Sequence, residues 1–347
     1  MQERAWWVVL AFAFLCVAVG PKEGVAQEKK AEDFYKGATL RFIVPYGAGG
    51  SRDLWARTLA PYLEKHTGAI VKVENMAGGS GLRGVDYLYS EAKPDGLTIC
   101  IAGMAGVVLA RMLELKQAAK SDIDKLNYLC RLDITQRALY ASKASGFKSI
   151  GDMQKSSDVR FTSTGGTADS AVDSALMSEG FGLKAKMVAG SSGSAEDLIV
   201  LAQGKANAKC STFSADYREA VEKGDLNLIL FLGTKGNPDY PQVPVALNAP
   251  GMTPGGKKYV ELSTDLVEVG QMLFTSPGVA EDRVLLLEKA IAASLKEPAL
   301  LEWAKKDRVN LAYLSGKGCK DLIIKMQKLV PQAEREDLRH IVFKKYY

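Results

Sequence analysis

Histidine is scarce in this chain, which contains only His66 and His340 among its 347 residues. Most serine and cysteine nucleophiles are activated by a histidine, so a catalytic triad has few possible parts here. We expect both histidines to lie at the surface. No group of histidine, cysteine and acidic residues has zinc spacing, and Asp122 and Asp124 lack the further ligands of a calcium loop. These absences argue against a hydrolase or a metalloenzyme.

Cysteines are also few, and their spacing matches neither a disulfide framework nor a metal site. Five occur in the chain, and four of them follow the N-terminal segment. We expect Cys100, Cys130, Cys210 and Cys319 to be buried free thiols.

The chain has no strong excess of either charge. The 45 basic and 40 acidic residues give a formal net charge of +5, which gives no reason to expect a nucleic-acid partner. The composition, 24% charged and 47% hydrophobic, is ordinary for a globular protein of a length that allows two domains.

Long apolar runs are absent except at the N-terminus. There, a polar start is followed by the run AWWVVLAFAFLCVAVG, and the small residues Gly24 and Ala26 precede Gln27 as in a cleavage site. We expect residues 1–26 to be a signal peptide, cleaved near Ala26, and the mature protein to be periplasmic. The alternative is an uncleaved anchor, which the run disfavours because it is shorter than the ~20 residues of a span.

Strand-like and helix-like segments alternate along most of the chain. Proline-rich sequence follows residue 236, and the pattern of the remaining chain predicts helices around residues 284–295, 300–306 and 320–328. Alternation of this kind predicts an α/β protein with mainly parallel sheets flanked by helices. Two closely spaced strands suggest a crossover between two lobes, with lobe 1 at residues 37–136 plus 237–347 and lobe 2 at residues 137–236. The hinge is expected near 134–139 and 234–240. The predicted strands are residues 39–44, 70–74, 97–103, 127–132, 138–142, 159–164, 184–190, 207–213 and 226–234.

The segment TLRFIVPYGAGGSRD combines an interior strand with a glycine-rich turn and the start of a helix. Its glycines allow backbone N–H groups to approach a guest, and the N-terminus of a helix attracts anions. We expect Ser51 to cap this helix and Asp53 to interact with the helix dipole. The alternative is a glycine-rich connection that binds no ligand.

A second glycine motif, Gly79-x-Gly81-x-x-Gly84, matches the dinucleotide fingerprint. That fingerprint also needs an acidic residue about twenty positions later, where this chain has Met104. We therefore expect no nucleotide and no other cofactor.

Several predicted strands end in loops rich in glycine, serine and threonine, at residues 46–52, 76–81, 162–167 and 190–194. Ligands of open parallel sheets bind at the carboxyl ends of strands, so two facing sheets would surround a cleft with these donors. The donors suit a carboxylate, because each hydrogen bond to a charged group contributes roughly 1.5–3 kcal/mol. Arg52, Arg57, Arg83 and Arg137 are candidates for additional positive charge.

The motifs IVPYGAGGSRD, VENMAGGSGLRG, KPDGLTI and FTSTGGTA resemble the Bug family, the solute-binding proteins of tripartite tricarboxylate transporters. The resemblance extends from about Thr39 to Pro244. It implies a two-lobed periplasmic binding protein-like fold with a ligand cleft between the lobes. It also implies that residues 46–53 and 163–168 hold the carboxylate of a small organic acid.

The chain departs from this family at three places. It has Gly190, Ser191, Ser192 and Gly193 where members usually have proline, tyrosine, lysine and glycine, so the pocket is expected to be wider there. Ser211 and Thr212 replace an aspartate-asparagine pair, and Met76-Ala77 replaces arginine-proline. Loss of an acidic residue favours a ligand with a second anionic group.

The sequence therefore predicts a monomeric, non-enzymatic solute-binding protein that delivers an organic acid to the membrane subunits of a secondary transporter. The alternatives are a sensory subunit for a membrane signalling partner and an exported enzyme that acts on carboxylates. The candidate ligand-binding residues are Tyr46, Gly47, Ala48, Gly49, Gly50, Ser51, Arg52, Asp53, Gly79, Ser80, Ser163, Thr164, Gly165, Gly166, Thr167, Ala168, Ser191, Ser192, Ser211 and Thr212.

Overall fold

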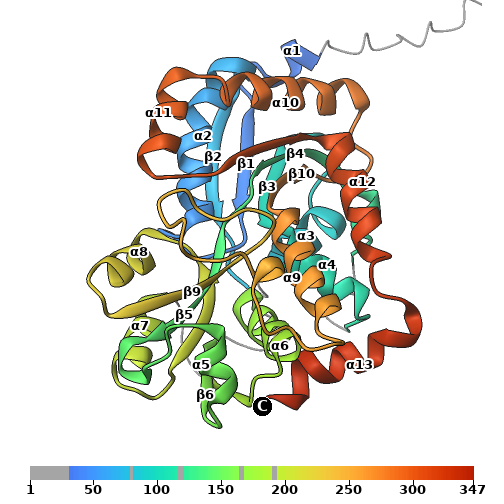
Figure 1. Ribbon diagram of the computed structural model, residues 1–347. Coiled ribbons are helices and arrows are strands. Elements are labelled where there is room, and N and C mark those ends of the chain that lie inside the picture. The colour runs from blue at the N-terminus through green and yellow to red at the C-terminus, as the bar shows by residue number, and fades with distance from the viewer. Residues whose placement is uncertain (1–30, 79–80, 116–120, 164–167, 190–193) are drawn as a thin grey trace, which may run out of the picture.

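The computed structural model describes residues 31–78, 81–115, 121–163, 168–189 and 194–347. The expected signal peptide lies outside these residues. Two sheets dominate the fold, one of six strands in the order β11-β4-β10-β3-β1-β2 and one of five in the order β7-β6-β8-β5-β9 (Figure 1). The strands are β1 (Thr39–Val44), β2 (Ile70–Asn75), β3 (Thr98–Gly103), β4 (Asn127–Asp133), β5 (Arg137–Ser142), β6 (Val159–Ser163), β7 (Ala185–Ala189), β8 (Ala208–Thr212), β9 (Leu226–Leu232), β10 (Gln271–Thr275) and β11 (Leu311–Ser315).

Each predicted strand is confirmed to within about two residues, but β10 and β11 were missed. Both lie in the part of the chain expected to be helical, and both run antiparallel to β4. Strand β10 has five residues, all buried, and a short apolar run of this kind cannot be told from a buried helical segment by its period. The six-stranded sheet, predicted to be mainly parallel, has two parallel and three antiparallel pairings.

Helices cover both faces of the six-stranded sheet. Residues alternate along β1, so that Phe42 and Val44 pack in the cluster of α2 and α10, whereas Ile43 packs in the cluster of α3, α4 and α12. This two-sided burial explains the nearly continuous apolar run in the sequence. The helices are α1 (Ala31–Tyr35), α2 (Ser51–Thr67), α3 (Leu82–Ser90), α4 (Met104–Met112), α5 (Ile150–Lys155), α6 (Asp169–Phe181), α7 (Ser194–Ala202), α8 (Ala215–Glu222), α9 (Lys257–Val269), α10 (Glu281–Ser294), α11 (Pro298–Lys306), α12 (Gly316–Gln327) and α13 (Arg335–His340).

The five-stranded sheet has its own aromatic cluster beside α8. Tyr140 and Tyr217 lie 4.7 Å apart between ring centroids, and Phe213 and Phe231 pack edge to face at 5.2 Å. Helix α6 covers the opposite face of this sheet and belongs to a second hydrophobic cluster. That cluster continues through α9 into the half that holds the six-stranded sheet. One hydrophobic core therefore joins the two sheets.

The chain passes from β4 to β5 through three residues and returns after β9. Strands of the six-stranded sheet come from residues 39–133 and 271–315, and strands of the other sheet from residues 137–232. The last helical segment, residues 341–345, contacts α6 of the five-stranded half (Figure 1). The exact division into lobes and the hinge positions remain predictions.

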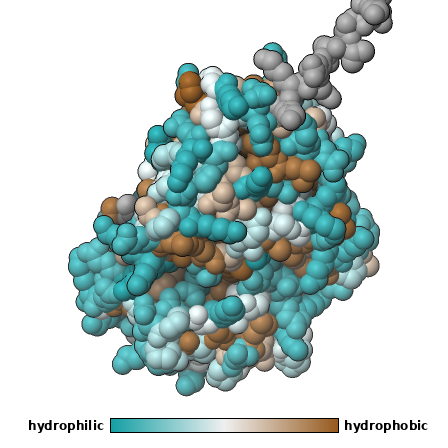
Figure 2. Space-filling model, turned by 90° about the horizontal axis from the view of Figure 1, so that it is seen from above, coloured by the Kyte–Doolittle hydropathy of each residue, from teal (hydrophilic) through white to brown (hydrophobic). Residues whose placement is uncertain are grey.

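The four cysteines are buried and free, as expected. Within the described residues, no helix is both long enough and apolar enough to cross a bilayer. Hydrophobic and hydrophilic residues are interspersed on the face seen in Figure 2. The large exposed apolar side chains come from separate elements, and they are Leu54, Ile70, Ile199, Leu285, Leu301, Tyr313 and Tyr347.

Candidate functional site

The carboxyl ends of the parallel strands in both sheets lie where the chain crosses between the sheets. Strands β1 and β3 run parallel, and β4 runs in the same direction because β3 and β4 are both antiparallel to β10. In the other sheet, β6, β7 and β8 run parallel, and β5 begins at their carboxyl ends. This topology places the carboxyl ends of β1, β2, β6 and β8 at the edges of the two sheets near the crossover.

The first glycine loop is fixed by the buried carboxylate of Asp53, which is 3% exposed. Its Oδ2 accepts hydrogen bonds of 2.9 Å from the Gly49 backbone N–H and from Nε of Arg57. Its Oδ1 accepts from Nδ2 of Asn75, also at 2.9 Å. The Arg57 bond is the main cause that lowers the pKa of Asp53 to about 2. Asp53 is thus an anchor of the loop, and direct contact of its carboxylate with a ligand remains a prediction.

The expected cap by Ser51 is wrong. The structure has Gly50 as the N-cap of α2, with extended backbone angles and no side-chain cap bond, and Ser51 is the first helical residue. A glycine at this position cannot offer a side-chain oxygen to the N–H groups of the first turn. Residues 47–51 are exposed, so this helix end can receive an anion from solvent.

Arg52 lies against the same loop. Its guanidinium carbon is 4.3 Å from the centroid of the Tyr46 ring, which is within the range of a cation–π contact. The Tyr46 hydroxyl in turn accepts a 3.4 Å hydrogen bond from the N–H of Gly103. Gly103 leaves room for the guanidinium, because a Cβ at this position would collide with Nη2 of Arg52. Nε of Arg52 is buried and has no hydrogen-bond partner among the described residues.

A buried polar cluster around Asp133 lies beside this cation, at the end of β4. Nε1 of Trp55 donates to Oδ2 of Asp133, and Thr135 Oγ1 donates to Oδ1 at 3.0 Å. Nε2 of Gln271 donates to both carboxylate oxygens, at 3.1 and 3.2 Å. Burial is the largest cause of a pKa of about 6 for Asp133, and the charge of Arg52 opposes it. The cluster thus joins α2, β4, β10 and the crossover.

This pKa predicts a pH dependence of stability. The folded pKa of about 6 lies above the reference value of 3.8, so the folded protein holds the proton of Asp133 more tightly than the unfolded chain does. The contribution is complete below about pH 4 and is lost as the pH rises to about 6, by at most about 3 kcal/mol. Urea unfolding from pH 4 to pH 7 measures it. Asp133→Asn should remove most of this decrease, and an equal decrease in both proteins would contradict the assignment.

In the five-stranded half, the described candidate residues lie at strand ends and at a helix start. Ser163 ends β6 and is buried, and Ala168 is the N-cap of α6. Ser211 and Thr212 end β8 and are half-buried. We refer to Ser163, Ala168, Ser211 and Thr212 as the second jaw. Contact of the second jaw with a ligand remains a prediction, and the candidates Gly79, Ser80, Thr164, Gly165, Gly166, Thr167, Ser191 and Ser192 lie outside the described residues.

Arg137, a candidate cation, is engaged by α6. Its Nη1 donates to Oδ2 of Asp173 at 2.5 Å, and its Nη2 lies 4.0 Å from Oδ2 of Asp169. Ser263 of α9 donates to the other oxygen of Asp173 at 2.9 Å. Both partners of the Arg137–Asp173 pair are buried. Arg137 therefore ties the start of β5 to α6, which makes Arg52 the better placed cation for an incoming anion.

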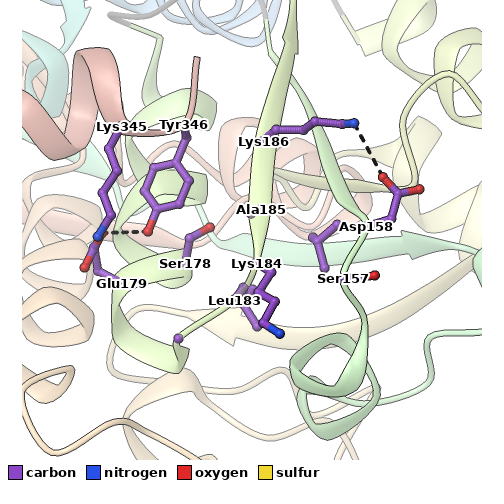
Figure 3. Close-up of a pocket in the computed structure, with 12 residues that line it drawn as sticks. Ser157, Asp158, Ser178, Glu179, Leu183, Lys184, Ala185, Lys186, Lys345 and Tyr346 are labelled. Carbon is purple, nitrogen blue, oxygen red and sulfur yellow. Dashed lines mark hydrogen bonds and ion pairs between the residues drawn. The ribbon is translucent and has the colours of Figure 1, made fainter.

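Two cavities lie away from the glycine loops. One of about 520 Å³ is lined by residues before β6, by the start of β7 and by the C-terminal segment, so it lies at the amino ends of these strands. Around it, Tyr346 donates to Glu179 at 2.6 Å, and Lys186 lies 3.6 Å from Asp158 (Figure 3). The other cavity, of about 320 Å³, lies between α9 and residues 329–338. Neither coincides with the site predicted from the sequence.

The cluster around Asp133 was missed at the level of sequence. An acidic residue directly after the apolar run NYLCRL was a signal for Asp133, because polar residues at the carboxyl ends of strands often line a site. Gln271 gave no such signal, since its strand was not predicted.

His66 lies at the end of α2, where its Nε2 is 2.7 Å from Oε1 of Glu297. The described ranges contain no group of three or more metal-ligating side chains.

Comparison with known proteins found relatives over part of the chain. Protein BugT of Bordetella pertussis is 38% identical over 79 residues, which are 23% of this chain and 24% of that protein. A UPF0065 protein of Bordetella bronchiseptica is 34% identical over 87 residues, 24% of this chain and 26% of that protein. The chain thus spans about a quarter of the length of the curated relatives it matches. No protein-family model matches the chain.

Solved structures match nearly the whole fold. The periplasmic binding protein BugD superposes with a TM-score of 0.67 at 19% identity, covering 89% of this chain and 99% of that one. MatC of Rhodopseudomonas palustris with bound malate gives 0.65 at 20% identity, covering 88% and 99%. Rpa4515 of R. palustris with adipate gives 0.67 at 19% identity, covering 88% and 97%. These comparisons confirm the resemblance to the Bug family and the periplasmic binding protein-like fold.

Proposed function

We propose that this protein is an exported solute-binding protein of the Bug type, which captures a small organic acid between two lobes. The observation that carries the proposal is the exposed N-terminus of α2, where Gly50 is the N-cap and Asp53 anchors the glycine loop. A carboxylate at this helix end would accept hydrogen bonds from backbone N–H groups, and the helix dipole would stabilise its negative charge. The carboxyl ends of the second sheet would supply the opposite wall.

The similar proteins support a dicarboxylate as the ligand. One solved structure of this fold holds malate and another holds adipate. Both acids carry two carboxylates, which agrees with the loss of an acidic residue at positions 211 and 212. In our proposal the α2 helix end takes one carboxylate, and Arg52 takes the other.

Binding would couple to closure of the lobes about the crossovers at residues 134–139 and 234–240. A ligand stabilises the closed state only by the additional contacts that it makes there. The closed, monomeric protein would then deliver the acid to the membrane subunits of a secondary transporter. Removal of a signal peptide near Ala26 and the absence of any catalytic role belong to the same proposal.

A thermal-shift screen over mono- and dicarboxylates tests this function. An acid present at a hundred times its dissociation constant adds about 2.7 kcal/mol to the free energy of unfolding. That corresponds to an increase of roughly 4 °C in melting temperature for a protein of this size. The absence of any shift with every organic acid would contradict the proposal, and turnover of an acid by the pure protein would favour an enzyme.

Arg52→Ala should weaken the binding of dicarboxylates more than that of monocarboxylates. A hydrogen bond to a charged group is worth about 1.5–3 kcal/mol, so we expect a loss of roughly 10- to 100-fold for malate and adipate. Titration calorimetry of both acids and of their singly charged half-amides measures the difference. Arg52→Lys, which keeps the charge but not the planar fork, should recover part of the affinity. Equal losses for both classes of acid would show that Arg52 only supports the loop.

A further inference from the structure

An ion pair lies completely buried beneath the second jaw. Nζ of Lys209 is 2.6 Å from Oδ2 of Asp197, and the two side chains are 1% and 2% exposed. Burial lowers the pKa of Lys209, and the charge of Asp197 opposes this effect. A charged pair removed from water costs several kcal/mol per ion unless further hydrogen bonds satisfy it. The pair joins α7 to β8, since Asp197 belongs to the helix and Lys209 to the strand.

The carboxylate of Asp197 connects separate segments that lead to the second jaw. Its Oδ1 accepts a 2.9 Å hydrogen bond from Oγ1 of Thr162, the residue directly before Ser163 in β6. Lys209 lies on β8, two residues before Ser211. Asp197 itself is in the first turn of α7. One carboxylate therefore fixes β6, β8 and the start of α7 relative to one another.

A fourth element, α8, packs beside Asp197. The buried hydroxyl of Tyr217 on α8 lies near Asp197 and Ser211, but it makes no hydrogen bond among the described residues. Burial is the main cause that raises the pKa of Tyr217, with the charge of Asp197 adding to it. The connection of the buried pair to Ser211 therefore runs along β8, where Lys209 lies two residues before it.

We propose that Asp197 and Lys209 are positioning residues for ligand binding, which hold the ends of β6 and β8, and with them Ser163 and Ser211 of the second jaw, at the spacing that the ligand requires. Neither side chain is exposed, so they act through Thr162, Ser163 and Ser211 rather than by touching the ligand. The inference depends on the proposed function, since it assigns the pair to the same site. A positioning role gives a reason for a buried lysine, Lys209, in this half of the protein.

The double variant Asp197→Leu/Lys209→Met separates positioning from stability. Replacing a buried ion pair by apolar residues of similar size is often neutral or stabilising, so this variant is expected to fold. We expect its affinity for malate and adipate, measured by titration calorimetry, to fall at least tenfold while its melting temperature stays near that of the parent. Ile229→Ala is the matched control, because Ile229 is buried on β9, two strands away from β8, and its loss should lower stability without changing affinity.

A conservative pair at Thr162 provides an independent test. Thr162→Ser keeps the hydroxyl that donates a hydrogen bond to Asp197, so it should retain the parental affinity. Thr162→Val removes this hydroxyl and should weaken the binding of the acid several-fold. Unchanged affinity in both the double variant and Thr162→Val, with normal binding by the parent, would overturn this inference alone. Failure of the parent to bind any acid would overturn the proposed function and the inference together.

Discussion

Trp55→Ala is expected to lower the free energy of unfolding by about 3–5 kcal/mol, the usual cost of removing a large buried aromatic side chain. Trp55 is 2% exposed, and its ring packs edge to face on Trp303 of α11 with centroids 4.9 Å apart. It also donates to Asp133, so the variant loses packing between α2 and α11 and leaves a buried carboxylate with one donor fewer. Urea unfolding at pH 7 measures the loss.

Trp55→Phe is the control for this prediction. It keeps most of the ring packing but loses the N–H donor, so its loss should be smaller and should depend on pH through Asp133. We expect the difference between Trp55→Phe and the parent to grow as the pH rises from 4 to 7, because the deprotonated carboxylate needs the donor more. A loss below about 1 kcal/mol for Trp55→Ala would contradict the described packing.

Asp53→Ala is expected to weaken ligand binding by about 100-fold, and it should also destabilise the protein. The variant releases the Gly49 N–H and the side chain of Asn75, so a ligand must order the glycine loop by itself. Fixing the backbone costs about 1–2 kcal/mol for each residue, so ordering even two residues accounts for such a loss. Titration with the best acid from the thermal-shift screen measures the change in affinity.

Arg57→Ala is the matched control for Asp53→Ala. It removes the ion pair between Asp53 and the Arg57 side chain, which is 53% exposed. The hydrogen bonds that Asp53 accepts from Gly49 and Asn75 stay in place. Because solvent screens the half-exposed Arg57, we expect a smaller loss of stability than in Asp53→Ala and almost no change in affinity. Equal losses of affinity in the two variants would mean that the charge of Arg57, and not the anchored loop, governs binding.

The sequence predicted most of the fold because its strands carry strong local signals. The apolar run of β1 and the turn signal before β3 could be recognised without knowledge of their neighbours. Strands β10 and β11 could not, because their identity depends on pairing with β4, which is distant in the sequence. The sequence also gave no indication that the C-terminal segment returns to contact α6.

The candidate site was predictable where it depends on backbone and not where it depends on buried side chains. The glycine loop after β1 could be found from its composition and its place at a strand end. The partners of Asp53 and Asp133 could not, because Asn75 and Gln271 come from other strands. The Asp197–Lys209 pair was also missed, since a lysine inside a strand usually suggests an exposed edge.

The central claim is that the anchored helix end of α2 binds a carboxylate. Titration calorimetry of the mature protein with malate and adipate, beside their uncharged diamides, tests it most directly. We expect saturable binding of at least one acid with one site per chain, no binding of the corresponding diamide, and about 100-fold weaker binding by Asp53→Ala. Equal binding of acid and diamide, or an unchanged affinity in Asp53→Ala, would contradict this account.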